Sequence, residues 1–345
     1  MTRRSAVPPP VTAVLDASSR WLPVRLGEVE TSLRELSSGH GEPLTEAATA
    51  TLAAGGKRLR PMLVLLCAGG NGGGAAVRAA TAIELVHMAT LVHDDVLDDA
   101  PLRRGQPTVA ATSGRPRAVA AGDLLFSRAF ALLAEAGDAR AVELLSEASV
   151  ALAHGELAQR HDAFDTGISE QRYLERCRLK TAKLFECACL LGLVATHHPR
   201  TRERGRETSG DDERVLAGAE EMAEFGSGIG LAFQLLDDVL DVAGPPERTG
   251  KARGTDLLDG TVTLPLIAAA EADSGIRSVD LRSLDAKTAE ALCDRIAATG
   301  ALDEVRSRAL EMVARAKEQL ESPAFDPEQR QLLGLVADGV VQRYS

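Results

Sequence analysis

The sequence predicts an all-α protein, and three observations lead to this fold class. Aromatic residues make up only 3% of the 345 residues. Ala, Leu, Glu and Arg dominate outside the glycines, and this composition favours helices. β-Branched and aromatic runs of the kind that form strands are few, whereas apolar residues recur at helical spacing from Trp21 onward.

The periodicity divides the chain into expected elements. Residues 1–18 are expected to form a flexible arm, because three consecutive prolines favour an extended backbone there. Residues 197–214 carry almost no apolar side chains and predict a mobile surface insert between two helices. Helices are predicted over residues 22–38, 44–68, 75–98, 115–136, 138–160, 169–196, 213–243, 260–273, 284–299, 301–321 and 326–343.

Charge and composition exclude several classes of function. The net charge of -11 and the pI of about 5.2 argue against nucleic acid or an anionic membrane as a partner, while leaving room for a local basic pocket. Neither a signal peptide nor an uninterrupted apolar stretch of about 18 residues occurs, so no membrane span is expected. We therefore expect a soluble protein.

The cysteines predict neither a disulfide framework nor a zinc site. Their number is odd, and no CxxC pair occurs. Small core residues in a reducing cytoplasm are the expected role of Cys67, Cys177, Cys187, Cys189 and Cys293.

The pentapeptide DDVLD occurs twice, at 94–98 and at 237–241, each time in an apolar helical block. Asp94 and Asp98 are four residues apart and share one helix face, as do Asp237 and Asp241. A single copy is more often a solvated acidic helix end than a metal site. Two copies favour magnesium, which takes one or two carboxylates together with substrate phosphates.

Basic residues complete the pattern. GGKRLRP at 55–61 supplies Lys57, Arg58 and Arg60, and Arg103 and Arg104 follow the first acidic motif. Guanidinium groups match phosphate oxygens well. Two acidic and two basic clusters therefore predict a site for two anionic groups, one bridged through magnesium and the other held directly by cations.

In these residues the chain resembles the trans-isoprenyl diphosphate synthases, or polyprenyl synthetases. The blocks that carry the resemblance span about residues 45–270, in the order of that family: GGKRLRP, HDDVLDDAPLRRGQPT, AGDLLFSRAF, LKTAKLF, FQLLDDVLD and GKARGTDLLDGTVTLPL. The resemblance implies one catalytic domain over residues 19–345. It further implies a helical bundle around a deep central cavity, usually homodimeric, with the two Asp-rich helices facing each other across the cavity mouth.

The resemblance also assigns roles to residues. As metal ligands, for about three magnesium ions, it implies Asp94, Asp98, Asp237 and Asp241. For isopentenyl diphosphate it implies Lys57, Arg60, His87 and Arg104. For the allylic diphosphate it implies Arg103, Lys180 and Lys251. Thr181 and Gln234 would stabilise a developing cation, and Gln234 shares a helix face with the second pair of aspartates. Asp95 and Asp238 point about 100° away from the ligands and are expected to support them.

The implied reaction lengthens an allylic diphosphate by five carbons. The allylic carbon–oxygen bond ionises, the double bond of isopentenyl diphosphate attacks, and the departing pyrophosphate removes a proton. Electrostatic stabilisation of the leaving group would supply most of the catalysis. No protein nucleophile is required, in agreement with the lack of a Ser-His-Asp or Cys-His arrangement in the sequence.

Two small residues bear on product length. Large aromatics four or five residues before the first aspartate stop growth early in this family, and this chain has Ala89 and Thr90 there. An open path favours extension, because each buried methylene contributes about 0.8 kcal/mol. We therefore expect products longer than twenty carbons. Phe126 and Phe130 could form the floor of the tunnel, although ordinary core packing explains both equally well.

Other readings stay open. Shorter farnesyl or geranylgeranyl products would use the same residues, and so would a non-catalytic partner subunit of a heteromeric synthase. Terpene cyclases normally replace the second acidic motif with an Asn/Ser/Glu triad and lack the GGKxxRP block. Synthases of the squalene type would not need the residues assigned to isopentenyl diphosphate.

Overall fold

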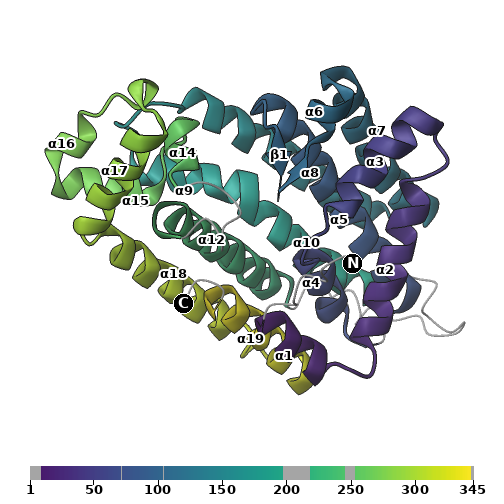
Figure 1. Ribbon diagram of the computed structural model, residues 1–345. Helices are drawn as coiled ribbons and strands as arrows, with labels where there is room; N and C mark the ends of the chain where they lie inside the picture. Colours follow the sequence, from purple (N-terminus) through teal and green to yellow (C-terminus); the bar gives the residue numbers. More distant parts are fainter. Residues whose placement is uncertain (1–8, 71, 104, 197–217, 245–252, 343–345) are drawn as a thin grey trace, which may run out of the picture.

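The computed structural model describes residues 9–70, 72–103, 105–196, 218–244 and 253–342, and within them the fold is all-α, as predicted. Figure 1 shows the arrangement. The first half contains α1 (Pro9–Ala17), α2 (Leu22–Leu36), α3 (Glu42–Ala53), α4 (Leu59–Ala68), α5 (Gly73–Leu97), α6 (Val109–Ser113), α7 (Arg115–Glu135) and α8 (Ala139–His161). The second half contains α9 (Glu170–Cys177), the π-helical turn η1 (Arg178–Ala182), α10 (Lys183–Thr196), α12 (Ala219–Ala243), α14 (Thr255–Leu258), α15 (Leu264–Ala272), α16 (Ser274–Arg277), the 3-10 turn η3 (Leu281–Ser283), α17 (Ala286–Ala298), α18 (Ala301–Gln319) and α19 (Pro327–Gln342).

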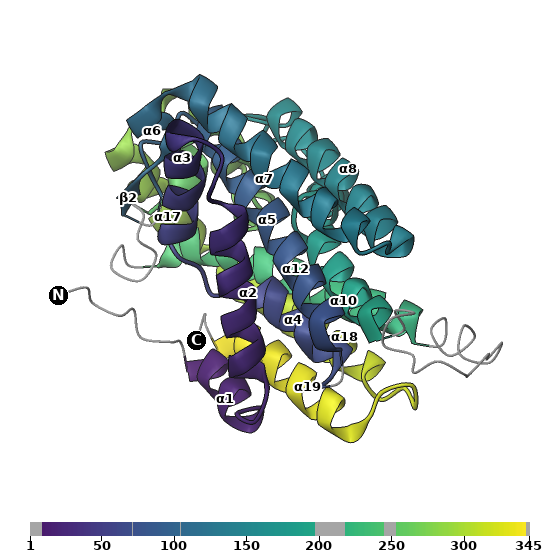
Figure 2. The same ribbon diagram turned by 90° about the vertical axis from the view of Figure 1, so that its right-hand side faces the viewer.

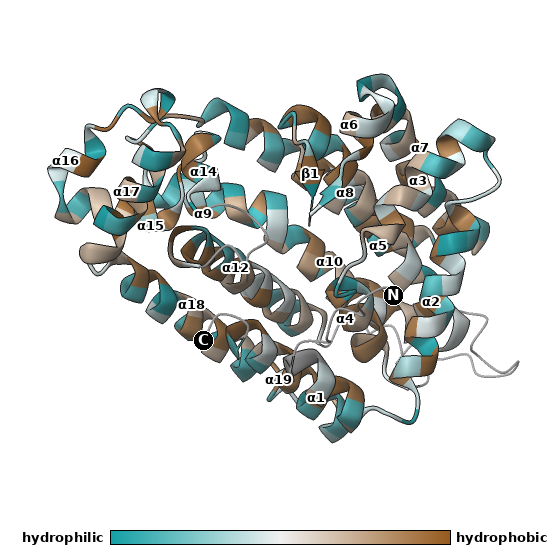
Figure 3. Ribbon diagram, in the orientation of Figure 1, coloured by the Kyte–Doolittle hydropathy of each residue, from teal (hydrophilic) through white to brown (hydrophobic). Residues whose placement is uncertain are grey.

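Helix α12 lies in the middle of the bundle, packed between α10 and α18 (Figure 1). On the other side of α10 lie α4 and α5, and α7 packs along α5. Helices α2 and α3 cross the outside of this second group (Figure 2). The core is apolar, and its largest fully buried side chains include Tyr173, Phe185 and Phe225. Hydrophilic and hydrophobic residues alternate along the outer helix α18, as expected for a helix with one buried face (Figure 3).

Periodicity alone did not reveal the break inside the block predicted as one helix over 44–68. The chain leaves the helix after Ala53 and re-enters it at Leu59. Gly55 and Arg58 both have positive φ, at 73° and 49°. In this conformation the guanidinium of Arg58 is held by Glu30 of α2 and by Glu84 of α5, with 2.7 Å between Arg58 Nη1 and Glu84 Oε1. Ion pairs with distant residues thus fix this turn.

The expected flexible arm is wrong for residues 9–17, which form α1. Prolines suit the first turn of a helix, where backbone N–H groups have no partner within the helix in any case. Val14 is buried, and α1 packs against α19 at the far end of the chain. The insert predicted over 197–214 lies outside the described residues.

A short antiparallel hairpin follows α5, which the sequence did not predict. It pairs β1 (Leu102–Arg103) with β2 (Gln106–Pro107). Two residues per strand are too few to leave a recognisable alternation. The hairpin carries Arg103 back beside the end of α5.

Two glycines fix the position of η1. A Cβ atom on Gly155 of α8 would lie 2.5 Å from the backbone nitrogen of Lys180, and one on Gly230 of α12 would lie 2.7 Å from Cα of Ala182. Both neighbours are backbone atoms of η1, so only glycine at these two positions allows α8 and α12 to approach η1 this closely. The π-helical turn, a conformation often found at functional sites, is therefore clamped between two helices.

Helix α5 is the one described helix that is long and apolar enough to cross a membrane by length and composition. Of its most apolar window, 78% is buried inside the protein. A core helix of a folded domain passes the same test, and α5 has the packing of such a helix.

Candidate active site

The first acidic motif lies at the C-terminal end of α5. Asp94 is in the last turn, and Asp98 is the residue that caps the helix. Burial raises the pKa of Asp94 to about 6, opposed by the positive charge of Lys180 and reinforced by Glu156. Arg103 and Asp98 also act on this carboxyl group. Asp94 is thus a desolvated carboxylate whose surroundings leave its charge incompletely stabilised.

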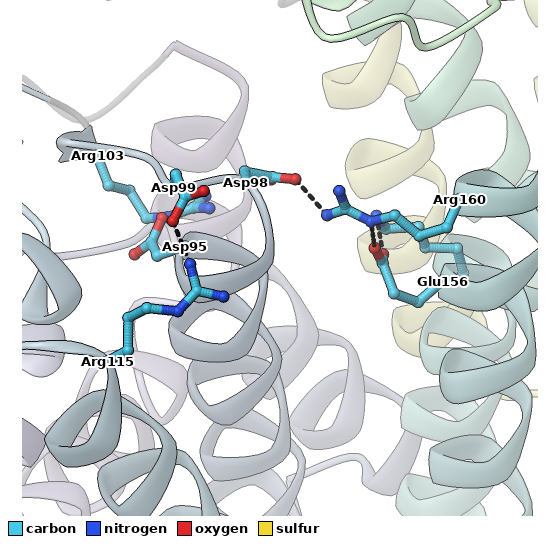
Figure 4. A network of polar contacts seen from close by, with 8 residues as sticks. Asp95, Asp98, Asp99, Arg103, Arg115, Glu156 and Arg160 are labelled. Atoms are coloured by element: carbon cyan, nitrogen blue, oxygen red, sulfur yellow. Dashed lines mark hydrogen bonds and ion pairs between the residues drawn. The ribbon is translucent and has the colours of Figure 1, made fainter. Parts of the chain in front are cut away.

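Asp95 holds the hairpin against the end of α5. Its carboxylate is buried and accepts a hydrogen bond from Nε of Arg103 at 2.7 Å (Figure 4). The expected supporting role of Asp95 therefore takes a definite form, because it orients Arg103. Asp99 extends the network outward through an ion pair with Arg115.

Two residues of α8 face the first motif, and sequence reasoning missed both. Arg160 donates a hydrogen bond to Asp98, and its Nε donates to Glu156 at 2.8 Å (Figure 4). Glu156 also accepts a hydrogen bond from Nζ of Lys180 on η1. Burial raises the pKa of Glu156, but Lys180 and Arg160 outweigh it and bring the pKa below its ordinary value. The HGE sequence at 154–156 was the available signal, because the glycine allows the close approach of α8 to η1.

The second acidic motif occupies the last turns of α12. Asp237 is exposed, and Asp241 is half-buried and accepts a hydrogen bond from the backbone nitrogen of Asp256 at 3.2 Å. Asp238 is buried and accepts from the hydroxyl of Tyr173 at 2.5 Å. Burial, with the charge of Asp256 adding to it, raises the pKa of Asp238 to about 8. Asp238 therefore belongs to the packing between α12 and α9.

Gln234 connects the second motif to η1. Its Nε2 donates to Asp238 at 2.8 Å, and its Oε1 accepts from the hydroxyl of Thr181 at 2.7 Å. Lys180, next to Thr181, is the cation that acts most strongly on Asp94. Chains of hydrogen bonds thus lead from the π-helical turn to both motifs, from Lys180 through Glu156 and Arg160 to Asp98, and from Thr181 through Gln234 to Asp238.

The residues expected to hold isopentenyl diphosphate are on α4 and α5. Lys57 is exposed on the loop before α4. The guanidinium of Arg60 lies over the ring of Phe185, 4.6 Å from its centroid. His87 is half-buried and lies two turns before Asp94 on the same face of α5. Arg104 and Lys251 were also predicted as substrate residues, and both lie outside the described residues.

The two positions expected to govern product length differ in burial. Ala89 is fully buried, whereas Thr90 is half-buried and its hydroxyl donates to the carbonyl of His87 at 2.8 Å. Phe126 is half-buried and stacks on His93, with 5.8 Å between ring centroids. This contact ties α7 to α5 one residue before Asp94, which favours the packing explanation for Phe126 over a tunnel floor.

The residues present fit a cation shared with a bound anion. In the described part of the chain, no three His, Cys, Asp or Glu side chains lie close enough together to hold a metal ion. Magnesium usually takes only one or two protein carboxylates and completes its shell with water and substrate phosphate oxygens. The oxygen donors of Asp94 and Asp98, and the incompletely stabilised charge of Asp94, suit such a cation.

The chain is similar to known proteins in sequence and in fold. The family model described as polyprenyl synthetase matches residues 42–298. The chain is 39% identical over 257 residues to heptaprenyl diphosphate synthase component 2 of Geobacillus stearothermophilus, covering 74% of this chain and 75% of that protein. It is 32% identical over 309 residues to geranylgeranyl diphosphate synthase of Methanosarcina mazei, covering 88% and 90%. The crystal structure of a decaprenyl diphosphate synthase from Rhodobacter capsulatus superposes with a TM-score of 0.83 at 31% identity, covering 97% and 99% of the two chains.

Proposed function

Because this chain belongs to the polyprenyl synthetase family, we propose that it joins isopentenyl diphosphate to an allylic diphosphate and makes an all-trans polyprenyl diphosphate longer than twenty carbons. The single observation that carries this proposal is that hydrogen bonds connect η1 to both acidic motifs, through Glu156 and Arg160 on one side and through Gln234 on the other. Lys180 also acts electrostatically on Asp94. A leaving diphosphate would be stabilised by Lys180, and a developing carbocation by Gln234, which the neighbouring Thr181 orients.

Different residues of this chain would stabilise the leaving group and the cation. Lys180 and Arg103 would hold the allylic diphosphate, and their charges would stabilise the pyrophosphate as the carbon–oxygen bond breaks. The amide oxygen of Gln234 has a second lone pair beyond the one that Thr181 occupies, and it would face the allylic cation. The released pyrophosphate would accept the proton that the new product loses.

Magnesium is the cofactor we propose. Asp94, Asp98, Asp237 and Asp241 would hold it, and when bound it would neutralise the charge that accumulates on the diphosphate. Lys57, Arg60, His87 and Arg104 would bind isopentenyl diphosphate, and Lys251 would join Arg103 and Lys180 on the allylic substrate. These assignments follow the pattern of the family at matching positions of this chain.

Product length is the finer part of the proposal. Thr90 shares the face of α5 that carries Asp94 and His87, so a tail leaving the diphosphate would pass over it. Its small, half-buried side chain supports the proposal that growth continues past twenty carbons. The decisive experiment incubates the purified chain with magnesium, labelled isopentenyl diphosphate and, separately, primers of ten, fifteen and twenty carbons, followed by chromatography. Products that stop at twenty carbons or below would refute the length we propose.

A heteromeric enzyme is the second candidate, because one relative is named as component 2 of its synthase. The same incubation separates the two. If the chain alone elongates a primer, it is a complete catalyst, and we expect light scattering to report a homodimer. We also expect the protein in the cytoplasm. If it binds labelled substrate without elongating it, it is a partner subunit.

A further inference from the structure

Arg160 brings a positive charge to the first acidic motif from a different helix. It is next to the last residue of α8 and reaches across to Asp98 at the end of α5 (Figure 4). The side chains of Arg160 and Asp98 are 39% and 37% exposed, so water and ions reach the contact. The same guanidinium is bound through Nε to Glu156, one helical turn earlier.

We propose that Arg160 is a tethered counter-ion of Asp98, which a divalent cation must displace from that carboxylate in order to bind it. This inference rests on the proposed function, because it takes Asp94 and Asp98 to be metal ligands. A carboxylate oxygen that accepts a hydrogen bond from a guanidinium has one lone pair engaged. The positive charge of a guanidinium in contact with the carboxylate also repels an incoming divalent ion.

Glu156 makes the exchange reversible. When Arg160 leaves Asp98, it keeps its hydrogen bond to Glu156, so the guanidinium is not left without a carboxylate partner. The ion pair that breaks is partly exposed, and pairs of that kind are weak in water. Arg160 would therefore raise the concentration of divalent cation that the site requires, without closing the site.

The neighbouring charges are consistent with this role. Asp94 shares its face of α5 with Asp98, and the positive charge of Lys180, which Glu156 also binds, acts on Asp94. Glu156 thus binds both Lys180, whose charge acts on Asp94, and Arg160, which binds Asp98. Arg160 differs from Lys180 in lying at the outer, exposed side of the motif, where a hydrated metal ion would arrive.

The test is a titration of metal-free protein with Mn²⁺ at low ionic strength, in which electron paramagnetic resonance reports the free ion. Wild type, Arg160→Gln and Arg140→Gln are compared. Arg140 is on the same helix, about 30 Å from Arg160, and pairs with Glu143 at the exposed surface, so its variant matches the change in charge. We expect Arg160→Gln to bind Mn²⁺ about two- to fivefold more tightly than wild type, and Arg140→Gln to match wild type.

Salt gives a second readout, because screening weakens exposed ion pairs and charge repulsion alike. The difference between wild type and Arg160→Gln should shrink as ionic strength rises. Equal or weaker binding by Arg160→Gln would overturn the inference and would mean that Arg160 orients Asp98 for the metal. Asp98→Asn tests the premise separately. If Asp98→Asn binds Mn²⁺ as wild type does, the proposed function of the motif fails as well. If neither wild type nor Arg160→Gln binds Mn²⁺ without a diphosphate, the counter-ion inference alone fails, because the proposed site shares its cation with a bound anion.

Discussion

Thr181 donates a hydrogen bond to the side-chain oxygen of Gln234 over 2.7 Å, and this contact joins the π-helical turn η1 to the helix that carries the second acidic motif. The amide of Gln234 is held at both ends, because its nitrogen donates to Asp238. Tyr173 in turn holds Asp238 from α9. The orientation of one amide oxygen thus depends on side chains from three elements.

Thr181→Val should therefore lower turnover while leaving substrate binding nearly unchanged. Valine keeps the shape of threonine but cannot donate a hydrogen bond, so Gln234 loses one of the two hydrogen bonds that fix its orientation. We expect kcat to fall about tenfold or more with little change in KM, and the free energy of unfolding to fall by about 1 kcal/mol. Steady-state kinetics and urea unfolding measure these effects. Thr31→Val is the control for the substitution itself, because it removes only an exposed hydrogen bond to the carbonyl of Gly27 within α2. An unchanged kcat in Thr181→Val would show that Gln234 does not depend on this contact.

Gly155→Ala should disturb η1 from the opposite side. The new Cβ would lie 2.5 Å from the backbone nitrogen of Lys180, and neither helix can move without breaking other packing. Overpacking of this kind costs about 1–3 kcal/mol. Gly27→Ala is the matched control, because Gly27 is inside α2 with nothing within 4 Å of an added Cβ. It should stabilise the protein by about 0.5–1 kcal/mol. Urea unfolding of both variants checks the pair, and equal effects would contradict the close approach.

The long helices could be predicted from the sequence because each keeps one apolar face over several turns. The breaks could not. Gly55 and Gly56 permit a break before α4, but the ion pairs of Arg58 with Glu30 and Glu84 join residues far apart in the sequence and could not be read from it. The π-helical turn has no sequence signature of its own, since it depends on Gly155 and Gly230 in other helices.

The residues of the candidate site were likewise only partly predictable from the sequence. Asp94 and Asp98 could be placed on one helix face because spacing along a helix is fixed. Glu156 and Arg160 could not be assigned to the site, because only the packing of α8 against α5 and η1 brings them there. The same holds for Tyr173, whose hydroxyl is bound to a residue 65 positions later in the chain.

The cysteines give a prediction about pH. Burial raises the pKa of Cys177 to about 12 and that of Cys293 to about 11, above the value of about 8.5 in an unfolded chain. The folded protein therefore retains protons that the unfolded chain loses, so this contribution to stability is complete below about pH 8.5 and is lost as the pH rises toward 11–12.

Two measurements test this prediction about the buried cysteines. All five cysteines are buried, so a disulfide-forming reagent at pH 8 should label native protein far more slowly than protein unfolded in guanidinium chloride. The urea midpoint should decrease between pH 8 and pH 11, and it should decrease less steeply in Cys177→Ala. Rapid labelling of the native protein would contradict the burial of these thiols.

Asp94→Ala and Asp237→Ala should each lower turnover by orders of magnitude with the fold intact, because loss of a metal ligand affects function more than stability. Asp99→Asn is the control within the same acidic stretch. Asp99 is largely exposed, and asparagine tolerates its positive φ of 49°. Circular dichroism verifies folding and a labelled-substrate assay measures the rate. Near-normal rates in either alanine variant would remove the assigned ligand role.

Replacement by phenylalanine should affect product length at one of the two small residues before Asp94 and stability at the other. Thr90 is one turn before Asp94 on the same face and is half-buried, so its replacement should stop a growing tail early and shorten the product. Ala89 is fully buried and points about 140° away from Asp94, so its replacement should chiefly overpack the core and lower stability by about 1–3 kcal/mol. Chromatography of products and thermal unfolding of both variants distinguish these effects. If Ala89→Phe shortened the product and Thr90→Phe did not, the tail would have to follow a different face of α5.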